Sequence, residues 1–229
     1  MIRLRGVRAL LTDIEGTTTA LEFVHQQLFP YARRELAAYV RTHERELGEI
    51  FAATRSAAGA AALSTAELIS QLLRWIDEDR KVTPLKELQG RIWRSGYESG
   101  ELQGHVYEDA VERLGAWHAA GIRIYIYSSG SIEAQRLLFS HTTAGDLTPL
   151  ISGYFDTTTG PKLEPQSYRS IAGSLALPAG AIVFLSDHPG ETAAAAQTGM
   201  QSVLLVRGDS AAAVTQPSAR SFDEIELTL

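Results

Sequence analysis

The chain has 229 residues, of which 45% are hydrophobic and 21% charged, so it can bury an ordinary globular core. Its net charge of −6 and isoelectric point near 5.5 argue against a nucleic-acid partner, which normally needs a basic face. The sequence lacks cysteine, which excludes disulfides and thiolate metal sites, and no apolar stretch is long enough to span a bilayer. We therefore expect a cytoplasmic protein with no membrane partner.

The first predicted strand is the apolar run at residues 7–12, which stops at Asp13 and Glu15, followed by Gly16. A buried strand that ends in this way is typical of the edge where an α/β sheet binds its ligand. Asp13 and Glu15 lie two residues apart, so on an extended segment their side chains should point the same way. Neighbouring anions repel, which favours a bound divalent metal, although an acidic strand-end turn explains the pattern equally well.

Residues 18–101 contain no convincing strand and are predicted to be helical. Ser64 and Glu67 form a capping box before an apolar stripe, and Thr83-Pro84 begins another helix with proline at its favoured first position. Residues 52–62 are rich in alanine and glycine, and we expect them to form a mobile connection. An insert placed directly after the first strand should cap that strand's carboxyl end.

The rest of the chain alternates predicted strands and helices. Val111, Leu114 and Trp117 show helical spacing, as do Tyr168, Ile171 and Leu175, and an alanine-rich helix runs from Glu191 to near Gly199. The predicted strands are at residues 122–127, 181–185 and 202–206, with a weaker one at 151–155. This alternation predicts a Rossmann-like α/β fold: a mostly parallel sheet with helices on both faces. The expected domains are a core of residues 1–17 and 102–229 and a small helical cap of residues 18–101, inserted after the first strand.

Three further segments carry polar residues that suit a phosphate site. Ser128 and Ser129 follow the second strand and precede a helix, where hydroxyls and free N–H groups bind anions, although such serines are often only N-caps. Lys162 stands in a rigid Gly-Pro-Lys loop, and Asp187 ends the strand at 181–185. Acid, hydroxyl, lysine and acid therefore follow one another along the chain, each after a strand or in a loop.

This series resembles the four motifs of the haloacid dehalogenase-like phosphohydrolases. The segment at residues 13–18, Asp-Ile-Glu-Gly-Thr-Thr, is more closely similar to the enolase-phosphatases (acireductone synthases) of methionine salvage, because the superfamily generally has aspartate where Glu15 stands. Further similar segments make the resemblance extend over essentially the whole chain: residues 28–31, 79–93, 125–131, 135–139 and 153–157. His188-Pro189-Gly190 departs from the pattern, since apolar residues are expected there, while Glu191 satisfies the weaker second acidic position.

The resemblance implies a role for each residue of the series. Asp13 would be the nucleophile that forms an aspartyl-phosphate, and Glu15 the acid/base that serves the leaving group and then water. One Mg²⁺ per chain would be held by Asp13, the backbone carbonyl of Glu15, and Asp187, a donor set of hard oxygens. Ser128, the backbone of Ser129, and Lys162 would hold the phosphate of a small-molecule substrate.

The resemblance also implies the reaction. A phosphorylated diketone, 2,3-diketo-5-methylthiopentyl 1-phosphate, would be enolised and then dephosphorylated to the acireductone 1,2-dihydroxy-3-keto-5-methylthiopentene. Glu15, a cap lysine (Lys81 or Lys86) and a histidine, of which His25 and His141 lie nearest the motifs, all remain possible bases; the role of Gln89 is also open. Two alternatives remain: a magnesium-dependent phosphatase of the same fold acting on sugar phosphates, and a non-catalytic metal- or phosphate-binding module. A monomer is expected.

Overall fold

The computed structural model describes residues 1–208 and 216–229, and the chain divides into two compact units. The first unit consists of Met1–Leu21 and Gly104–Leu229, and the second of Glu22–Gln103. This division assigns residues 18–21 to the first unit and 102–103 to the second, opposite to the boundaries expected from the sequence. Within the described ranges, no helix has the length and apolar character needed to cross a membrane.

Among the described residues of the first unit, six strands form a sheet in the order β4-β3-β2-β5-β6-β7, and every neighbouring pair is parallel. The two central strands are fully buried, as expected when helices cover both faces of a parallel sheet. The six strands are β2 (Ala9–Thr12), β3 (Arg123–Tyr127), β4 (Ile151–Phe155), β5 (Ile182–Ser186), β6 (Gln201–Leu205) and β7 (Ser218–Ala219). The parallel α/β fold and the predicted strands, including the weaker one, are confirmed.

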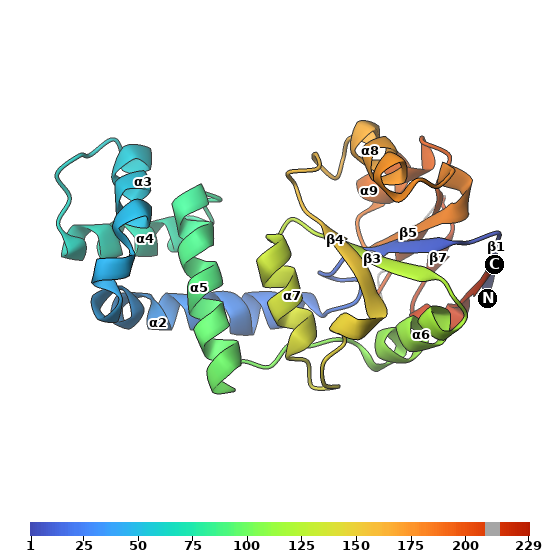
Figure 1. Ribbon diagram of the computed structural model, residues 1–229, viewed down its shortest axis with the longest axis horizontal. Coiled ribbons are helices and arrows are strands. Elements are labelled where there is room, and N and C mark those ends of the chain that lie inside the picture. The colour runs from blue at the N-terminus through green and yellow to red at the C-terminus, as the bar shows by residue number, and fades with distance from the viewer. Residues whose placement is uncertain (209–215) are drawn as a thin grey trace. The chain divides into compact units, whose positions relative to one another are not determined.

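Two further strands form a separate parallel pair that the sequence analysis did not predict. β1 (Ile2–Arg5) lies beside β8 (Ile225–Thr228), with Ile2 opposite Ile225 and Arg5 opposite Thr228. The two chain ends therefore lie close together in the first unit (Figure 1).

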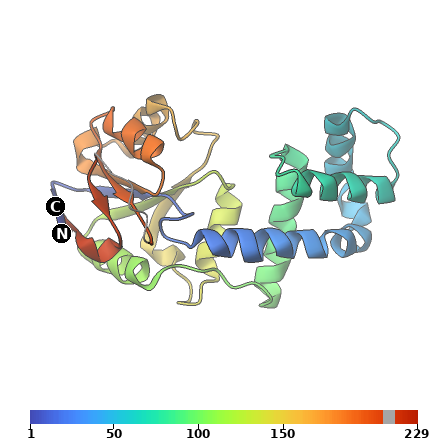
Figure 2. The ribbon, with the colours of Figure 1, turned by 180° about the vertical axis from the view of Figure 1, so that it is seen from behind.

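Helices cover both faces of the six-stranded sheet (Figures 1 and 2). On one face lie α8 (Pro165–Leu175) and α9 (Pro189–Ala196), whose apolar residues share a buried cluster with inward-facing residues of β2, β3 and β5. On the opposite face lies α6 (Glu108–Ala119), and α7 (Ile132–Ser140) follows β3 and packs beside β4. Short 3₁₀ turns occur at Thr148–Leu150, Ala179–Ala181 and Phe222–Glu224.

The second unit is built from helices. The short helix α1 (Leu21–Phe23) and a π-helical turn (Val24–Leu28) lead into α2 (Phe29–Thr42), and a 3₁₀ turn (Glu44–Glu46) leads into α3 (Gly48–Ala58). Two longer helices complete it, α4 (Thr65–Asp77) and α5 (Thr83–Ser99). The predicted capping box before α4 is present, with Ser64 and Glu67 each accepting a hydrogen bond from the other's backbone N–H.

One expectation for this unit is wrong. Residues 52–58, expected to form part of a mobile connection, belong to α3. Alanine is the residue that most favours helix, and here Ala52 and Ala53 lie between the buried residues Phe51 and Thr54. The helix ends at Gly59, whose φ of +65° is the left-handed conformation typical of a glycine C-cap.

Candidate active site

The turn after β2 places Asp13 at the carboxyl end of a central strand. The carbonyl of Ile14 accepts hydrogen bonds from the N–H groups of Thr17, Thr18 and Thr19, so the chain folds back at once. Glu15 lies in this turn and forms an isolated parallel bridge with Thr19. Asp13 is buried, with 5% of its surface exposed, whereas Glu15 is partly exposed.

Lys162 lies between two carboxylates. Its Nζ is 2.7 Å from Oδ1 of Asp13 and 2.7 Å from Oε2 of Glu191, and only 7% of its side chain is exposed. Lys162 comes from the loop between β4 and α8, and Glu191 from the first turn of α9. The hydroxyl of Ser186 also donates to Oε2 of Glu191. The loop thus brings a lysine onto Asp13, directly after β2, and the helix brings a second acid onto the same lysine.

The electrostatics of this group leave negative charge in excess. Burial raises the pKa of the Asp13 carboxyl to about 7; Lys162 opposes the shift and Glu191 adds to it. Burial alone would lower the pKa of the Lys162 ammonium, but its two carboxylate partners raise that pKa, so the lysine stays protonated. Burial, with repulsion from Glu191, also raises the pKa of Asp187.

Asp187 follows β5 and packs against the turn after β2. Its backbone N–H donates to the hydroxyl of Thr17 at 3.0 Å. Its carboxylate occupies the space beside Gly16, where an added Cβ would lie 2.1 Å from Oδ2; Gly16 also has a φ of +66°. Since Thr12 and Leu185 are paired in register on β2 and β5, Asp13 and Asp187 leave neighbouring strands at the same edge of the sheet.

The donors at this edge fit a hard divalent cation. Asp13 and Glu191 contact the ammonium of Lys162, Asp187 interacts electrostatically with Lys162 and Glu191, and a cation would offset the remaining negative charge. The part of the chain that the structure describes has no group of three or more His, Cys, Asp or Glu residues that could hold a metal. A site here would therefore use few carboxylates together with a backbone carbonyl and water, as Mg²⁺ often does.

Ser128 and Ser129 lie in the turn between β3 and α7. Ser128 is buried, its Oγ accepts a hydrogen bond from the N–H of Gly130, and its own N–H donates to Phe155, whereas Ser129 is exposed. Ser131 is the residue that caps α7, accepting from the N–H of Ala134. The N-cap role considered for Ser128 and Ser129 thus falls to Ser131.

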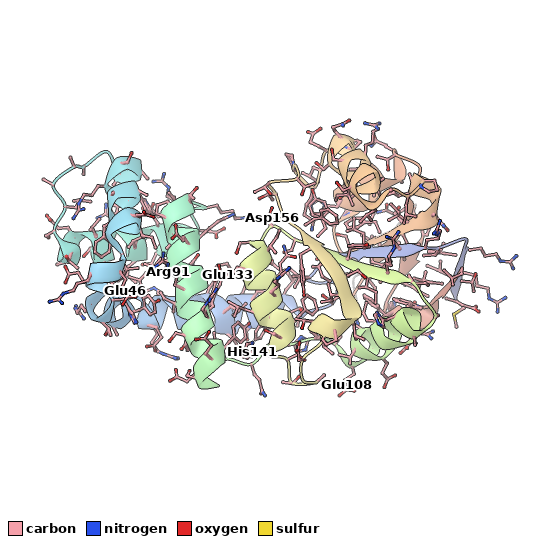
Figure 3. All side chains as sticks on the ribbon, viewed as in Figure 1. Glu46, Arg91, Glu108, Glu133, His141 and Asp156 are labelled. Atoms are coloured by element: carbon pink, nitrogen blue, oxygen red, sulfur yellow. The ribbon has the colours of Figure 1, made fainter. Side chains whose placement is uncertain are left out.

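The remaining candidates are spread over both units. Lys81, Lys86 and His25 are exposed, and Gln89 is buried, all in the second unit. His141 lies at the end of α7, in the first unit (Figure 3).

His188, where the sequence departs from the expected pattern, has a structural role. Its Nδ1 accepts a hydrogen bond from the N–H of Gly190, so the side chain caps α9. The helix that carries Glu191 therefore begins with a histidine cap and a proline.

Arg207, which the sequence pattern did not indicate, binds the turn after β2 through the carbonyl of Thr17. Its guanidinium donates to both carboxylate oxygens of Asp109 at 2.9 Å and to the carbonyl of Thr17 at 2.8 and 3.1 Å. It also lies 3.9 Å from the ring centre of Tyr107, and Asp109 accepts the N–H of Phe222. The hydroxyl of Thr17 accepts a hydrogen bond from the N–H of Asp187. Arg207 therefore stabilises the turn after β2 directly and the turn after β5 through Thr17.

This fold and this arrangement of acids and lysine define a haloacid dehalogenase-like hydrolase, and the model of that family matches residues 7–199. The chain is 52% identical to enolase-phosphatase E1 of Methylococcus capsulatus, over 96% of this chain and 97% of that protein. It is 51% identical to enolase-phosphatase E1 of Pseudomonas aeruginosa, over 96% of this chain and 98% of that protein. Within the hydrolases, the chain belongs to the enolase-phosphatase E1 family.

A solved structure agrees with this placement. The UTR4 protein of Saccharomyces cerevisiae superimposes with a TM-score of 0.81 at 33% identity, covering 95% of this chain and 99% of that one. The sequence-based interpretation of the chain as an enolase-phosphatase and a phosphatase enzyme is confirmed at the level of the family.

Proposed function

We propose that this protein converts 2,3-diketo-5-methylthiopentyl 1-phosphate to the acireductone 1,2-dihydroxy-3-keto-5-methylthiopentene and inorganic phosphate, as a step of methionine salvage. Relatives named enolase-phosphatase E1, about half identical over nearly the whole chain, support the substrate. The observation that carries the chemistry is the ion pair of Asp13 and Lys162, buried at the carboxyl edge of the parallel sheet.

Asp13 is the proposed nucleophile. Its carboxylate attacks phosphorus in line, the bond from phosphorus to the substrate oxygen breaks, and an aspartyl-phosphate forms. The carboxylate must be ionised to attack, and the ammonium of Lys162, 2.7 Å from Oδ1, favours the ionised form against burial. The same ammonium can donate hydrogen bonds to phosphate oxygens, so it neutralises charge on both reactants.

Glu15 is the proposed acid/base. It gives a proton to the departing substrate oxygen and then takes one from the water that attacks the aspartyl-phosphate, which releases phosphate and restores Asp13. Glu15 is partly exposed and lies two residues beyond the buried Asp13. This exposure supports the role, because Glu15 must reach the bound substrate to donate a proton and a water molecule to accept one.

Mg²⁺, one per chain, is the proposed cofactor, with Asp13, the backbone carbonyl of Glu15, and Asp187 as its protein ligands. When bound, it would offset phosphate charge and polarise the substrate carbonyl whose neighbouring carbon loses a proton. The chain's own contribution is to fix these oxygens: Gly16 leaves room for the carboxylate of Asp187, and Thr17 holds its backbone.

The phosphate is proposed to bind to the hydroxyl of Ser128, the N–H of Ser129, and Lys162. Ser128 is buried and fixed by two backbone hydrogen bonds, which suits a residue that must present its hydroxyl in one direction. The enolisation base stays open between Glu15, Lys81 or Lys86, and a histidine. The monomeric state and the cytoplasmic location also remain predictions.

The deciding experiment follows the diketone phosphate with wild-type protein and with Asp13→Asn. Wild type should release phosphate only when Mg²⁺ is present. The variant should stop after enolisation, so that a conjugated enol absorbing in the near ultraviolet accumulates without free phosphate. If wild type hydrolyses sugar phosphates as readily as the diketone phosphate, and no enol species is seen at any time, only the sugar-phosphate alternative would remain.

A matched pair of variants tests the cap lysines. Lys81→Ala or Lys86→Ala should abolish enolisation while hydrolysis of a simple aryl phosphate is retained, if that lysine is the base or its helper. Full enolisation by both variants would exclude the two lysines and leave Glu15 or a histidine.

A further inference from the structure

Three consecutive backbone carbonyls of the loop that carries Lys162 each accept a hydrogen bond from a side-chain hydroxyl. Tyr127 donates to the carbonyl of Gly160 at 2.8 Å, Ser167 to that of Pro161 at 2.7 Å, and Tyr168 to that of Lys162 at 2.7 Å. Tyr127 is the last residue of β3, and the other two lie in the first turn of α8. We call Tyr127, Ser167 and Tyr168 the hydroxyl clamp.

Outside the hydroxyl clamp, this loop has backbone hydrogen bonds from the N–H of Thr159 to the carbonyl of Asp156 and from the N–H of Glu164 to that of Pro161. Residues 156–164 lie outside helices and strands, and Pro161 has no N–H to donate. Gly160 adopts a φ of +144°, and a Cβ at that position would lie 2.3 Å from the hydroxyl oxygen of Ser167. Glycine therefore permits both the backbone conformation and the close approach of Ser167. The loop is shaped to receive these hydroxyls.

The clamp residues are themselves rigid. Tyr127 and Tyr168 are fully buried, and Ser167 is 2% exposed. The ring of Tyr168 packs edge-on against Tyr127 at 5.7 Å and against Phe184 at 5.0 Å. The ammonium of Lys162 lies 5.8 Å from the ring centre of Tyr127. Tyr127 therefore contacts the loop that carries Lys162 through its hydroxyl, and its ring lies near the ammonium of the same lysine.

We infer that the hydroxyl clamp positions Lys162 for phosphate, making Tyr127, Ser167 and Tyr168 positioning residues of the reaction. The inference rests on the proposed role of Lys162 in holding the phosphate. A lysine side chain has many rotamers, and its ammonium reaches a fixed point only if its backbone is fixed. Since a displacement of about 1 Å in a catalytic group can cost as much as 100-fold in rate, three bonds to three successive carbonyls are a substantial constraint.

The test compares Tyr168→Phe, Ser167→Ala and Tyr127→Phe with the matched control Tyr154→Phe. The hydroxyl of Tyr154 is buried and has no hydrogen-bond partner among the described residues, so the control removes an equivalent atom without touching the loop. For each variant we would measure the inhibition constant of inorganic phosphate, KM, kcat and the thermal unfolding midpoint, with Mg²⁺ at saturation.

Each clamp variant should raise the phosphate inhibition constant and KM roughly 3- to 10-fold, as expected for losing one hydrogen bond that orients a binding group. The control should stay within twofold of wild type. Ser167→Ala leaves both buried tyrosines unchanged, so it carries the test if a tyrosine variant does not fold.

The inference is wrong if the clamp variants bind phosphate as the control does, or if only their unfolding midpoints fall. These outcomes are separable from failure of the proposed function. If wild-type protein releases no phosphate from any ester, the proposed function fails; if wild type is active and the clamp variants bind phosphate normally, only the clamp fails.

Discussion

Replacing Asp13 by asparagine should stabilise the protein in a pH-dependent way. The carboxyl of Asp13 is buried, and its pKa rises from 3.8 in the unfolded chain to about 7 in the folded protein. Between these two values the folded protein keeps a proton that the unfolded chain has lost. The free energy of unfolding of wild type therefore falls as the pH rises through this window, and an amide, which does not ionise, avoids that loss.

The magnitude follows from the shift. A difference of about 3 pH units, at roughly 1.4 kcal/mol per unit, gives an upper value of about 4 kcal/mol. Lys162 keeps Glu191 as a partner in the variant, so its ammonium is not left alone. We therefore expect Asp13→Asn to be more stable than wild type by roughly 2–4 kcal/mol at pH 8, and by little at pH 4.

The assay is urea unfolding of both proteins from pH 4 to pH 8 in the presence of a chelator. Asp146→Asn is a control of opposite sign: hydrogen bonds from Thr148 lower the pKa of Asp146 below 3.8, so its carboxyl stabilises the folded protein throughout this range, and the variant should be less stable than wild type by a nearly constant amount. A difference between Asp13→Asn and wild type that does not grow from pH 4 to pH 8 would refute the reasoning. The same variant should release no phosphate. The negative charge of Asp13 would then be required for activity while lowering the free energy of unfolding of the protein.

Three other outcomes follow from the contacts described. Asp187→Asn should fold normally but need more Mg²⁺ for activity, and Ca²⁺ should not replace Mg²⁺, whereas full activity in excess chelator would exclude a metal role. Arg207→Ala removes the ion partner of Asp109, whose partly buried carboxylate keeps the N–H of Phe222, so chemical unfolding should show a loss of about 1.5–3 kcal/mol; Arg3→Ala, which breaks an exposed pair, should cost less than about 1 kcal/mol, and equal losses would contradict this. Ser64→Ala removes a helix cap and should cost about 1 kcal/mol in thermal unfolding, and an unchanged midpoint would show the cap to be unimportant.

The parts of the fold that depend on local pattern were predictable. Short apolar runs bounded by glycine, serine or aspartate gave the strands of the parallel sheet, and the Ser64 capping box located the start of α4. The acids and the lysine were predictable because the carboxyl ends of parallel strands share one edge. The structure brings Lys162 onto Asp13 there, although their roles stay proposals.

The parts that depend on distant partners were not predictable. Arg207 pairs with Asp109 and Thr17, which lie 98 and 190 residues away, and nothing in its neighbourhood marks it. In the sequence, Tyr127 and Tyr168 are indistinguishable from ordinary core aromatic residues. Only the folded structure shows that their hydroxyls bind the loop that carries Lys162. Composition also misled at residues 52–58, because alanine favours helix and the glycine that suggested mobility, Gly59, instead ends α3.

The pairing of β1 with β8 has a consequence for synthesis of the protein. Arg3 meets Glu226 across 223 residues, so β1 leaves the ribosome well before β8 and has no partner until β8 has been made. At about 5–20 residues per second, that wait lasts roughly ten seconds or more. Meanwhile the nascent strand is an open edge that neighbouring chains could join. Its alternating arginines, Arg3 and Arg5, place charge along that edge and discourage such pairing until β8 arrives.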